Sequence, residues 1–288
     1  MPEGSGPFAR LGFDARREVP SNLIAGGSVL GVVVIVAALG PAIAPYPFDE
    51  MHIRHRLEGP SLEFLLGTDQ YGRDVLSRTL VGARLSLFMG FAATALSVAV
   101  GVPLGLIAGY ARGAGGELVM RAMDVLMSFP PILLGLLILA LTPPSLWKAA
   151  VAVGIVYVPV IVRVTRSVTL GLAQEEFILA ARARGERTWY VLLAEILPNA
   201  WPPIIVEASL RVTFAILLGA ALSFLGMGAQ PPSSDWGLMI SDARPFINEA
   251  PWMALVPGLA MCITVVGINL FGEGLRELLD PRFARWRS

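Results

Sequence analysis

The sequence predicts an all-α, polytopic membrane protein with six transmembrane helices. Two features of composition indicate this class: 55% of the 288 residues are hydrophobic and only 15% are charged, whereas soluble domains carry about 25% charged residues. The third feature is the length of the apolar runs. A helix needs ~20 apolar residues to cross the hydrocarbon core of a bilayer, and several charge-free stretches of the chain reach this length.

The first predicted span lies near the N-terminus. Residues 1–21 are expected to form a cytoplasmic N-terminal segment and residues 22–46 the first transmembrane helix. No charge appears between Glu18 and Asp49, and this run is too long for the apolar region of a cleaved signal peptide. We therefore expect the first helix to stay attached and to serve as the targeting signal.

The remaining spans are expected to form a core permease domain, residues 84–275. Charge-free windows place four of them between Arg84 and Arg112, over Val125–Leu141, between Lys148 and Arg163, and between Glu249 and Glu273. The fifth span is expected over Ile204–Met227 and holds Glu207 and Arg211 near its start. An external loop, 47–83, precedes this core, and a long cytoplasmic loop, 163–203, interrupts it. Long ordered loops in compact domains tend to be functional. Residues 276–288 are predicted to form a cytoplasmic tail.

The distribution of arginine predicts the orientation. With the N-terminus inside, the cytoplasmic segments hold twice as many basic residues as the external segments, in agreement with the positive-inside rule. Six spans then leave both termini in the cytoplasm. The net charge is zero. The chain therefore has no excess of positive charge that would favour binding of nucleic acid, and nucleic acid is not expected as a partner.

Motifs for catalysis and for cofactor binding are missing from the sequence. A P-loop needs a glycine-rich turn followed by Lys and Ser or Thr, and Lys148, the only lysine, has no such turn before it. Cys262 is the only cysteine, which excludes an internal disulfide and a cysteine metal cluster. His52 and His55 alone make no metal site. The chain is therefore expected to be no enzyme and to bind no cofactor or metal.

Ionisable residues are rare in the predicted spans. Asp124, Glu207, Arg211 and Glu273 fall near predicted cytoplasmic ends, where we expect them to anchor helices or to form pairs. A secondary carrier acting alone would need carboxylates deep in its spans, so this class is disfavoured. A membrane-embedded enzyme would need a clustered catalytic set, and a structural scaffold would leave the ordered motifs unexplained.

Small residues recur at every fourth position in two predicted spans. Such faces allow a neighbouring helix to approach closely, so we expect helix packing there. The residues are Gly101, Gly105 and Gly109 in the second span, and Gly219 and Ser223 in the fifth.

Residues 175–185 of the cytoplasmic loop are predicted to form a short helix. The residues expected to share its docking face recur at helical spacing: Phe177, Ala180, Ala181 and Arg184. Glu176 suits the N-terminal turn, Arg182 suits the C-terminal turn, and Gly185 can end the helix. This helix either fits a groove on a partner protein or lies on the membrane surface.

Several segments resemble one family of transport proteins. The pattern Glu-Phe-Ile-x-Ala-Ala-Arg-Ala-x-Gly at 176–185, followed by Ile-Leu-Pro-Asn at 196–199, resembles the EAA loop of ABC importer permeases. Segments 67–78, 223–237 and 269–282 are similar to the C-type permease subunit of dipeptide, oligopeptide and nickel importers. The residues assigned to the external signature of that family are Gly67, Asp69, Gly72, Arg73 and Asp74.

This resemblance implies a type I ABC importer permease fold in the bacterial cytoplasmic (inner) membrane. The implied partners are a second homologous permease, two ABC ATPases that bind ATP and Mg, an external substrate-binding protein and the lipid bilayer. The chain would form half of the translocation pathway for peptides, or for a related small solute such as a nickel complex. The residues implied to couple it to an ATPase are Glu176, Phe177, Ala180, Ala181, Arg182, Arg184 and Gly185.

Overall fold

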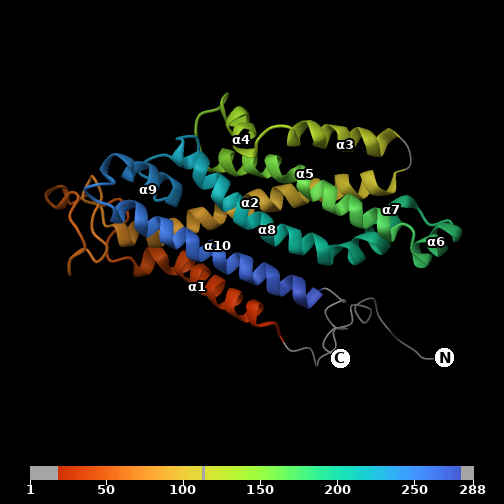
Figure 1. The fold of residues 1–288 in the computed structure, drawn as a ribbon, viewed down its shortest axis with the longest axis horizontal. Helices are drawn as coiled ribbons and strands as arrows, with labels where there is room; N and C mark the ends of the chain where they lie inside the picture. The colour runs from red at the N-terminus through yellow and green to blue at the C-terminus, as the bar shows by residue number, and fades with distance from the viewer. Residues whose placement is uncertain (1–18, 112–113, 280–288) are drawn as a thin grey trace.

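The computed structural model of the chain describes residues 19–111 and 114–279 (Figure 1). Helices occupy most of these two ranges, and no strand is present within them. One isolated antiparallel bridge joins Thr68 and Asp74. The all-α prediction is therefore confirmed. Most of the predicted N-terminal segment and most of the predicted C-terminal tail lie outside the described residues.

Five helices within these ranges are long and apolar enough to cross a membrane. They are α1 (Ser21–Ile43), α2 (Val75–Tyr110), α5 (Leu146–Leu172), α8 (Leu197–Phe224) and α10 (Trp252–Leu279). The shorter elements are η2 (Ile53–His55), α3 (Ala114–Met127), α4 (Pro131–Leu139), α6 (Glu176–Ala183), α7 (Thr188–Tyr190), the π-helical turn η3 (Val191–Ile196), α9 (Trp236–Ala243) and η4 (Arg244–Phe246). The pair α3 and α4 supplies the sixth span if it is counted as one broken helix.

The third span, predicted over Val125–Leu141, is broken in the structure. The helices α3 and α4 meet at an angle of 91°, and the break lies at residues 128–130. Pro130 and Pro131 explain the break, because proline lacks a backbone N–H and disfavours the helical conformation of the residue before it. The apolar run is long enough for a span, but it does not continue along one axis.

The predicted external loop, 47–83, is too long at its C-terminal end. The helix α2 already begins at Val75, because Asp74 caps it: the Asp74 carboxylate accepts a hydrogen bond of 2.8 Å from the N–H of Ser77. Such a cap satisfies a backbone donor that has no partner within the helix.

The predicted cytoplasmic loop, 163–203, is mostly helical. The helix α5 continues to Leu172, and η3 runs directly into α8 at Leu197. A helix can continue into water beyond an arginine that marks the end of a span. A charge-free window stops at that arginine, so it underestimates the length of the helix. The segment between α5 and η3 contains only the short helices α6 and α7.

The helix α8 lies at the centre of the bundle. It packs against α2, α5 and α10, while α1 packs along α10 (Figure 1). The elements α6 and α7 lie at one end of the molecule, and α9 lies at the opposite end with residues 44–74 (Figure 1). The two predicted loops are thus separated by the length of the spans.

The glycine face of α2 meets α5 at close range. A Cβ atom at Gly101 would lie 2.7 Å from Ile161 Cβ, and one at Gly105 would lie 2.5 Å from Thr165 Cβ. Gly109 repeats this relation one turn further, where its Cβ would lie 2.6 Å from a Thr169 carbon. Only a residue without a side chain fits at these positions.

The two small residues of α8 behave differently from each other. Gly219 lies against the side chain of Met89 on α2, with no room for a Cβ atom. Ser223 is buried, and its hydroxyl accepts a hydrogen bond of 3.3 Å from the N–H of Ala229. Ser223 therefore holds the turn that follows α8.

Candidate functional site

The helix α6 ends in a tight turn that fixes its direction. Gly185 has a φ of +78°, a conformation that glycine adopts without steric cost. Its N–H donates to the carbonyl of Arg182 at 2.9 Å, and the N–H of Glu186 donates to the carbonyl of Ala181 at 3.2 Å. These two bonds form a Schellman motif, which satisfies carbonyl groups at the end of the helix.

The predicted docking face of α6 is wrong in part. Ala181 and its neighbour Ile178 are fully buried and belong to a core cluster that includes Val191 and Ile196 of η3. Phe177 packs against the same cluster, whereas Ala180 is exposed. Helical spacing identifies residues that share a face, but Ile178 turns this face toward the protein itself.

Large apolar side chains are exposed at this end of the molecule instead. We call them the coupling surface: Leu179, Trp189, Tyr190 and Leu193, which are 47%, 65%, 48% and 55% exposed. They come from three elements, α6, α7 and η3. Glu176 and Arg184 are exposed beside them. Exposed apolar groups rimmed by polar residues indicate a binding surface for a protein or a membrane. The sequence prediction missed this surface. The signal for it was the pair of adjacent aromatic residues, Trp189 and Tyr190, in a loop that is otherwise mostly polar.

Arg182 points toward the bundle and not toward a partner. Its Nε donates a hydrogen bond of 3.0 Å to the hydroxyl of Tyr110, and its guanidinium lies 4.5 Å from the centre of the Tyr110 ring. Tyr110 is the last residue of α2. A hydrogen bond and a cation–π contact on the same ring thus fix α6 relative to α2.

At the opposite end, the predicted external signature folds into a buried turn. Gly67 and Gly72 have positive φ values of 77° and 75°. The carboxylate of Asp69 accepts from the N–H of Tyr71 at 2.8 Å and of Arg73 at 2.9 Å, and it pairs with the Arg73 side chain at 2.6 Å. The residues predicted here are brought together, but they are buried and do not present their charges to a partner.

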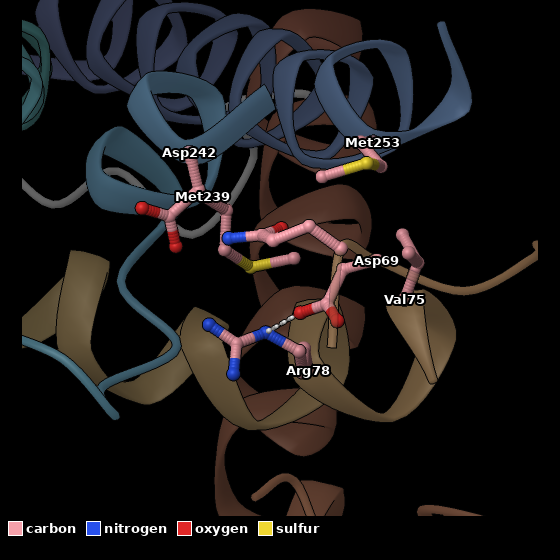
Figure 2. A pocket seen from close by; sticks show the side chains of 7 residues that line it. Asp69, Val75, Arg78, Met239, Asp242 and Met253 are labelled. Atoms are coloured by element: carbon pink, nitrogen blue, oxygen red, sulfur yellow. Dashed lines mark ion pairs between the residues drawn. The ribbon is translucent and has the colours of Figure 1, made fainter. Parts of the chain in front are cut away.

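Arg78, which the predicted set did not include, joins this turn to distant parts of the chain. It is 1% exposed. Its guanidinium donates to the carbonyls of Ser233 at 2.9 Å, Phe48 at 3.3 Å and Pro232 at 3.4 Å. Its Nε lies 3.6 Å from the Asp69 carboxylate (Figure 2). One side chain therefore links α2, the external loop and the segment that leads into α9.

Asp242 of α9 completes a four-residue group that we call the external latch: Asp69, Arg73, Arg78 and Asp242. Arg73 Nη2 lies 3.8 Å from the Asp242 carboxylate. Burial raises the pKa of Asp242 above its usual value, against the opposing attraction of Arg78 and Arg73. A cavity of about 10 Å³ lies between Asp69, Arg78, Asp242 and Met239 (Figure 2), and this volume holds one water molecule at most. The latch is therefore a structural clamp without room for a solute.

Two tryptophans fasten the same end. Trp236 at the start of α9 donates its indole N–H to the carbonyl of Thr79 at 3.0 Å, and Trp252 at the start of α10 donates to the carbonyl of Thr68 at 3.1 Å.

Within residues 19–111 and 114–279, no group of three or more His, Cys, Asp or Glu side chains is placed to hold a metal ion.

Comparison with known proteins decides the family. Residues 101–285 match the family described as "Binding-protein-dependent transport system inner membrane component". The chain belongs to this family. It is therefore a multi-pass permease, and a family of this description works with a binding protein.

Curated relatives cover most of this permease. It is 42% identical to the "Dipeptide transport system permease protein DppC" of Alkalihalophilus pseudofirmus over 93% of this chain and 89% of that protein. It is 40% identical to the "Di/tripeptide transport system permease protein DppC" of Pseudomonas aeruginosa, over 89% and 87% of the two chains. It is 39% identical to the "Glutathione transport system permease protein GsiD" of Pectobacterium atrosepticum, over 90% and 86%.

A solved structure shares the fold. A chain of the MetNI methionine ABC transporter, in an inward-facing form, superposes with a TM-score of 0.59 and 18% sequence identity, covering 70% of this permease and 96% of that chain. The predicted type I ABC importer fold is confirmed by this similarity.

Proposed function

We propose that this permease forms half of the translocation pathway of an ATP-driven importer for small peptides. One observation carries the proposal. At one end of a peptide-permease fold, α6 is rigidly held and lies in an exposed apolar surface, the coupling surface. The relatives named as dipeptide, di/tripeptide and glutathione permeases support a peptide as the solute. The alternative solute is a nickel complex, and measuring the uptake of both solutes distinguishes it from a peptide.

In this proposal, one of two ATPases docks on the coupling surface, and a second homologous permease completes the pathway. The ATPases bind ATP and Mg, and this chain holds neither. Because ATP binds better to the complex whose spans face outward, it shifts the population toward that state. The coupling surface transmits this shift as a rigid movement, since Arg182 joins α6 to α2 and the turn at Gly185 closes its far end.

We propose an orientation on the basis of the positions of the two ends. The coupling surface faces the cytoplasm, where the ATPases are, and both termini lie on that side of the inner membrane. The external latch then faces outward, toward the substrate-binding protein. The excess of arginine in the cytoplasmic segments supports this orientation.

The experiment compares two glycine substitutions in the purified complex. Gly185→Val places a β-branched residue at a φ of +78°, which is a genuine outlier and redirects the end of α6. Gly171→Val, at the end of α5, is the matched control, because a Cβ there meets nothing within 4 Å. ATPase retained after purification and ATP-dependent uptake of a labelled dipeptide into proteoliposomes are measured for both variants.

We expect Gly185→Val to lose the ATPase and most uptake, while Gly171→Val keeps both. Equal retention of the ATPase by the two variants would reject α6 as the docking element. Uptake of a nickel complex in place of the dipeptide by the unmodified complex would reject the peptide assignment.

A further inference from the structure

An ion pair lies within one of the spans. Arg211 Nε and Glu207 Oε1 of α8 are 2.8 Å apart. The sequence prediction placed both residues near the start of a span, but α8 already begins at Leu197, so Arg211 stands halfway along it. Its guanidinium also lies 5.6 Å from the ring centre of Tyr157, near the middle of α5. Ionisable groups inside spans are costly and mark solute or ion pathways.

The guanidinium of Arg211 is held in place with most of its donors unused. It lies 4.7 Å from the ring centre of Phe214, in addition to its contact with Tyr157. The direction of the Nε–H leaves this buried donor without a hydrogen-bond acceptor. Among the described residues, no hydrogen bond reaches the Nη atoms either. A guanidinium carries five N–H donors, so this one is oriented by aromatic rings and remains available to a ligand.

The pair opens onto a stripe of α8 that the described part of the chain covers only in part. The stripe consists of Glu207, Leu210, Phe214 and Leu217, which recur at helical spacing. Phe214 and Leu217 are 46% and 42% exposed, and the side chains of Arg211 and Glu207 are 17% and 19% exposed. Charged groups within a membrane face a bundle interior or a water-filled cavity and not lipid, so the α8 stripe belongs to the inside of the assembled complex.

We infer that Arg211 and Glu207 form a solute-binding subsite on the translocation pathway, and that its ligand is a small zwitterion with a free carboxylate and a free ammonium group. The carboxylate takes the unused Nη donors of Arg211 in a two-point contact, and the ammonium pairs with Glu207. A zwitterion adds no net charge to the Arg211–Glu207 pair, whereas a solute of one sign would bring one uncompensated charge into the span. This inference rests on the proposed function, because a short peptide is such a zwitterion.

Labelling of an introduced cysteine tests the subsite without any need for transport. The natural cysteine, Cys262, is exposed and is first replaced by serine. Leu217→Cys then reports on the α8 stripe without removing a ring that holds Arg211, and Leu259→Cys, on the exposed apolar face of α10, is the control expected to face lipid. The purified complex in proteoliposomes is treated with a water-soluble maleimide, with and without millimolar dialanine, its N-acetyl derivative or its C-terminal amide.

We expect Leu217→Cys to be labelled and Leu259→Cys to remain unlabelled, because thiols react only where water reaches them. Dialanine should slow the labelling about tenfold, and neither capped derivative should do so. Adding Arg211→Gln should abolish the protection, whereas adding Arg163→Gln, from an exposed ion pair with Asp124, should leave it unchanged.

Two results would overturn the subsite. No labelling at Leu217→Cys would mean that a second subunit or lipid seals the α8 stripe. Equal protection by dialanine and by both capped peptides would mean that the pair does not recognise the termini. These results are independent of the proposed function, which fails instead if the unmodified complex takes up no dipeptide with ATP.

Discussion

Gly105→Ala tests whether α2 and α5 meet as closely as the structure places them. An alanine Cβ at this position would lie 2.5 Å from Thr165 Cβ and 2.9 Å from the carbonyl oxygen of Val162, whereas carbon atoms in contact lie about 3.5–4.0 Å apart. Thr165 and Val162 are both 0% exposed. No flexible side-chain end can move aside, so the two helices must separate by about 1 Å. Overpacking of this kind costs about 1–3 kcal/mol.

The matched control is Gly258→Ala in α10, where a Cβ meets nothing within 4 Å. Alanine favours a helix over glycine by about 1 kcal/mol in water, so this variant should be unchanged or slightly more stable. The free energy of unfolding is measured for both variants by titrating the detergent-solubilised protein with dodecyl sulfate. Equal free energies for the two variants would refute the close approach of α2 and α5.

Three further predictions concern the ends of the molecule. Arg78→Met should lower the stability of the external latch by about 3 kcal/mol, since it leaves buried partners without a cation. Limited proteolysis should cleave this variant faster than the unmodified protein. Arg84→Met, at an exposed position, should be cleaved at the unmodified rate. Burial raises the pKa of Asp235 above its ordinary value of 3.8, so the folded protein holds this proton more tightly than the unfolded chain does. Stability should therefore fall as the pH rises from that ordinary value through the raised pKa, and Asp235→Asn, which keeps a capping side chain at α9, should flatten this part of a thermal-unfolding profile. Tyr110→Leu should lower uptake per ATP hydrolysed several-fold, whereas Tyr110→Phe, which keeps the ring beside Arg182, should retain most of it; uptake and hydrolysis are measured in the same proteoliposomes.

Charge-free windows predicted where the spans are, because the cost of a charge in hydrocarbon is visible in composition. They did not predict where the helices begin and end. The helix α2 begins nine residues before Arg84, at the Asp74 cap, and α8 begins at Leu197, seven residues before the predicted start at Ile204. A window that stops at every charge cannot distinguish a charge in water from one inside the bundle, and this distinction depends on tertiary contacts.

The functional residues divide in a similar way. The turn at Gly185 was predictable, since glycine after a basic helical turn is a local signal. The inward orientation of Arg182 was not, because its partner Tyr110 is distant in the chain. The acceptors of Arg78 are backbone carbonyls, which every residue carries, so no sequence pattern marks them.

The helix α2 connects the two ends of the permease. It is 36 residues long, which corresponds to about 54 Å at 1.5 Å per residue. Its first turn carries Arg78 of the external latch, and its last residue, Tyr110, holds Arg182 of α6. The glycine face between these ends packs closely against α5. If an ATPase docks on the coupling surface as proposed, we expect α2 and α5 to move as one unit and the latch at the far end to move with them. For this reason, loss of the Tyr110 contact should reduce coupling without weakening the latch, and loss of Arg78 should weaken the latch without releasing the ATPase.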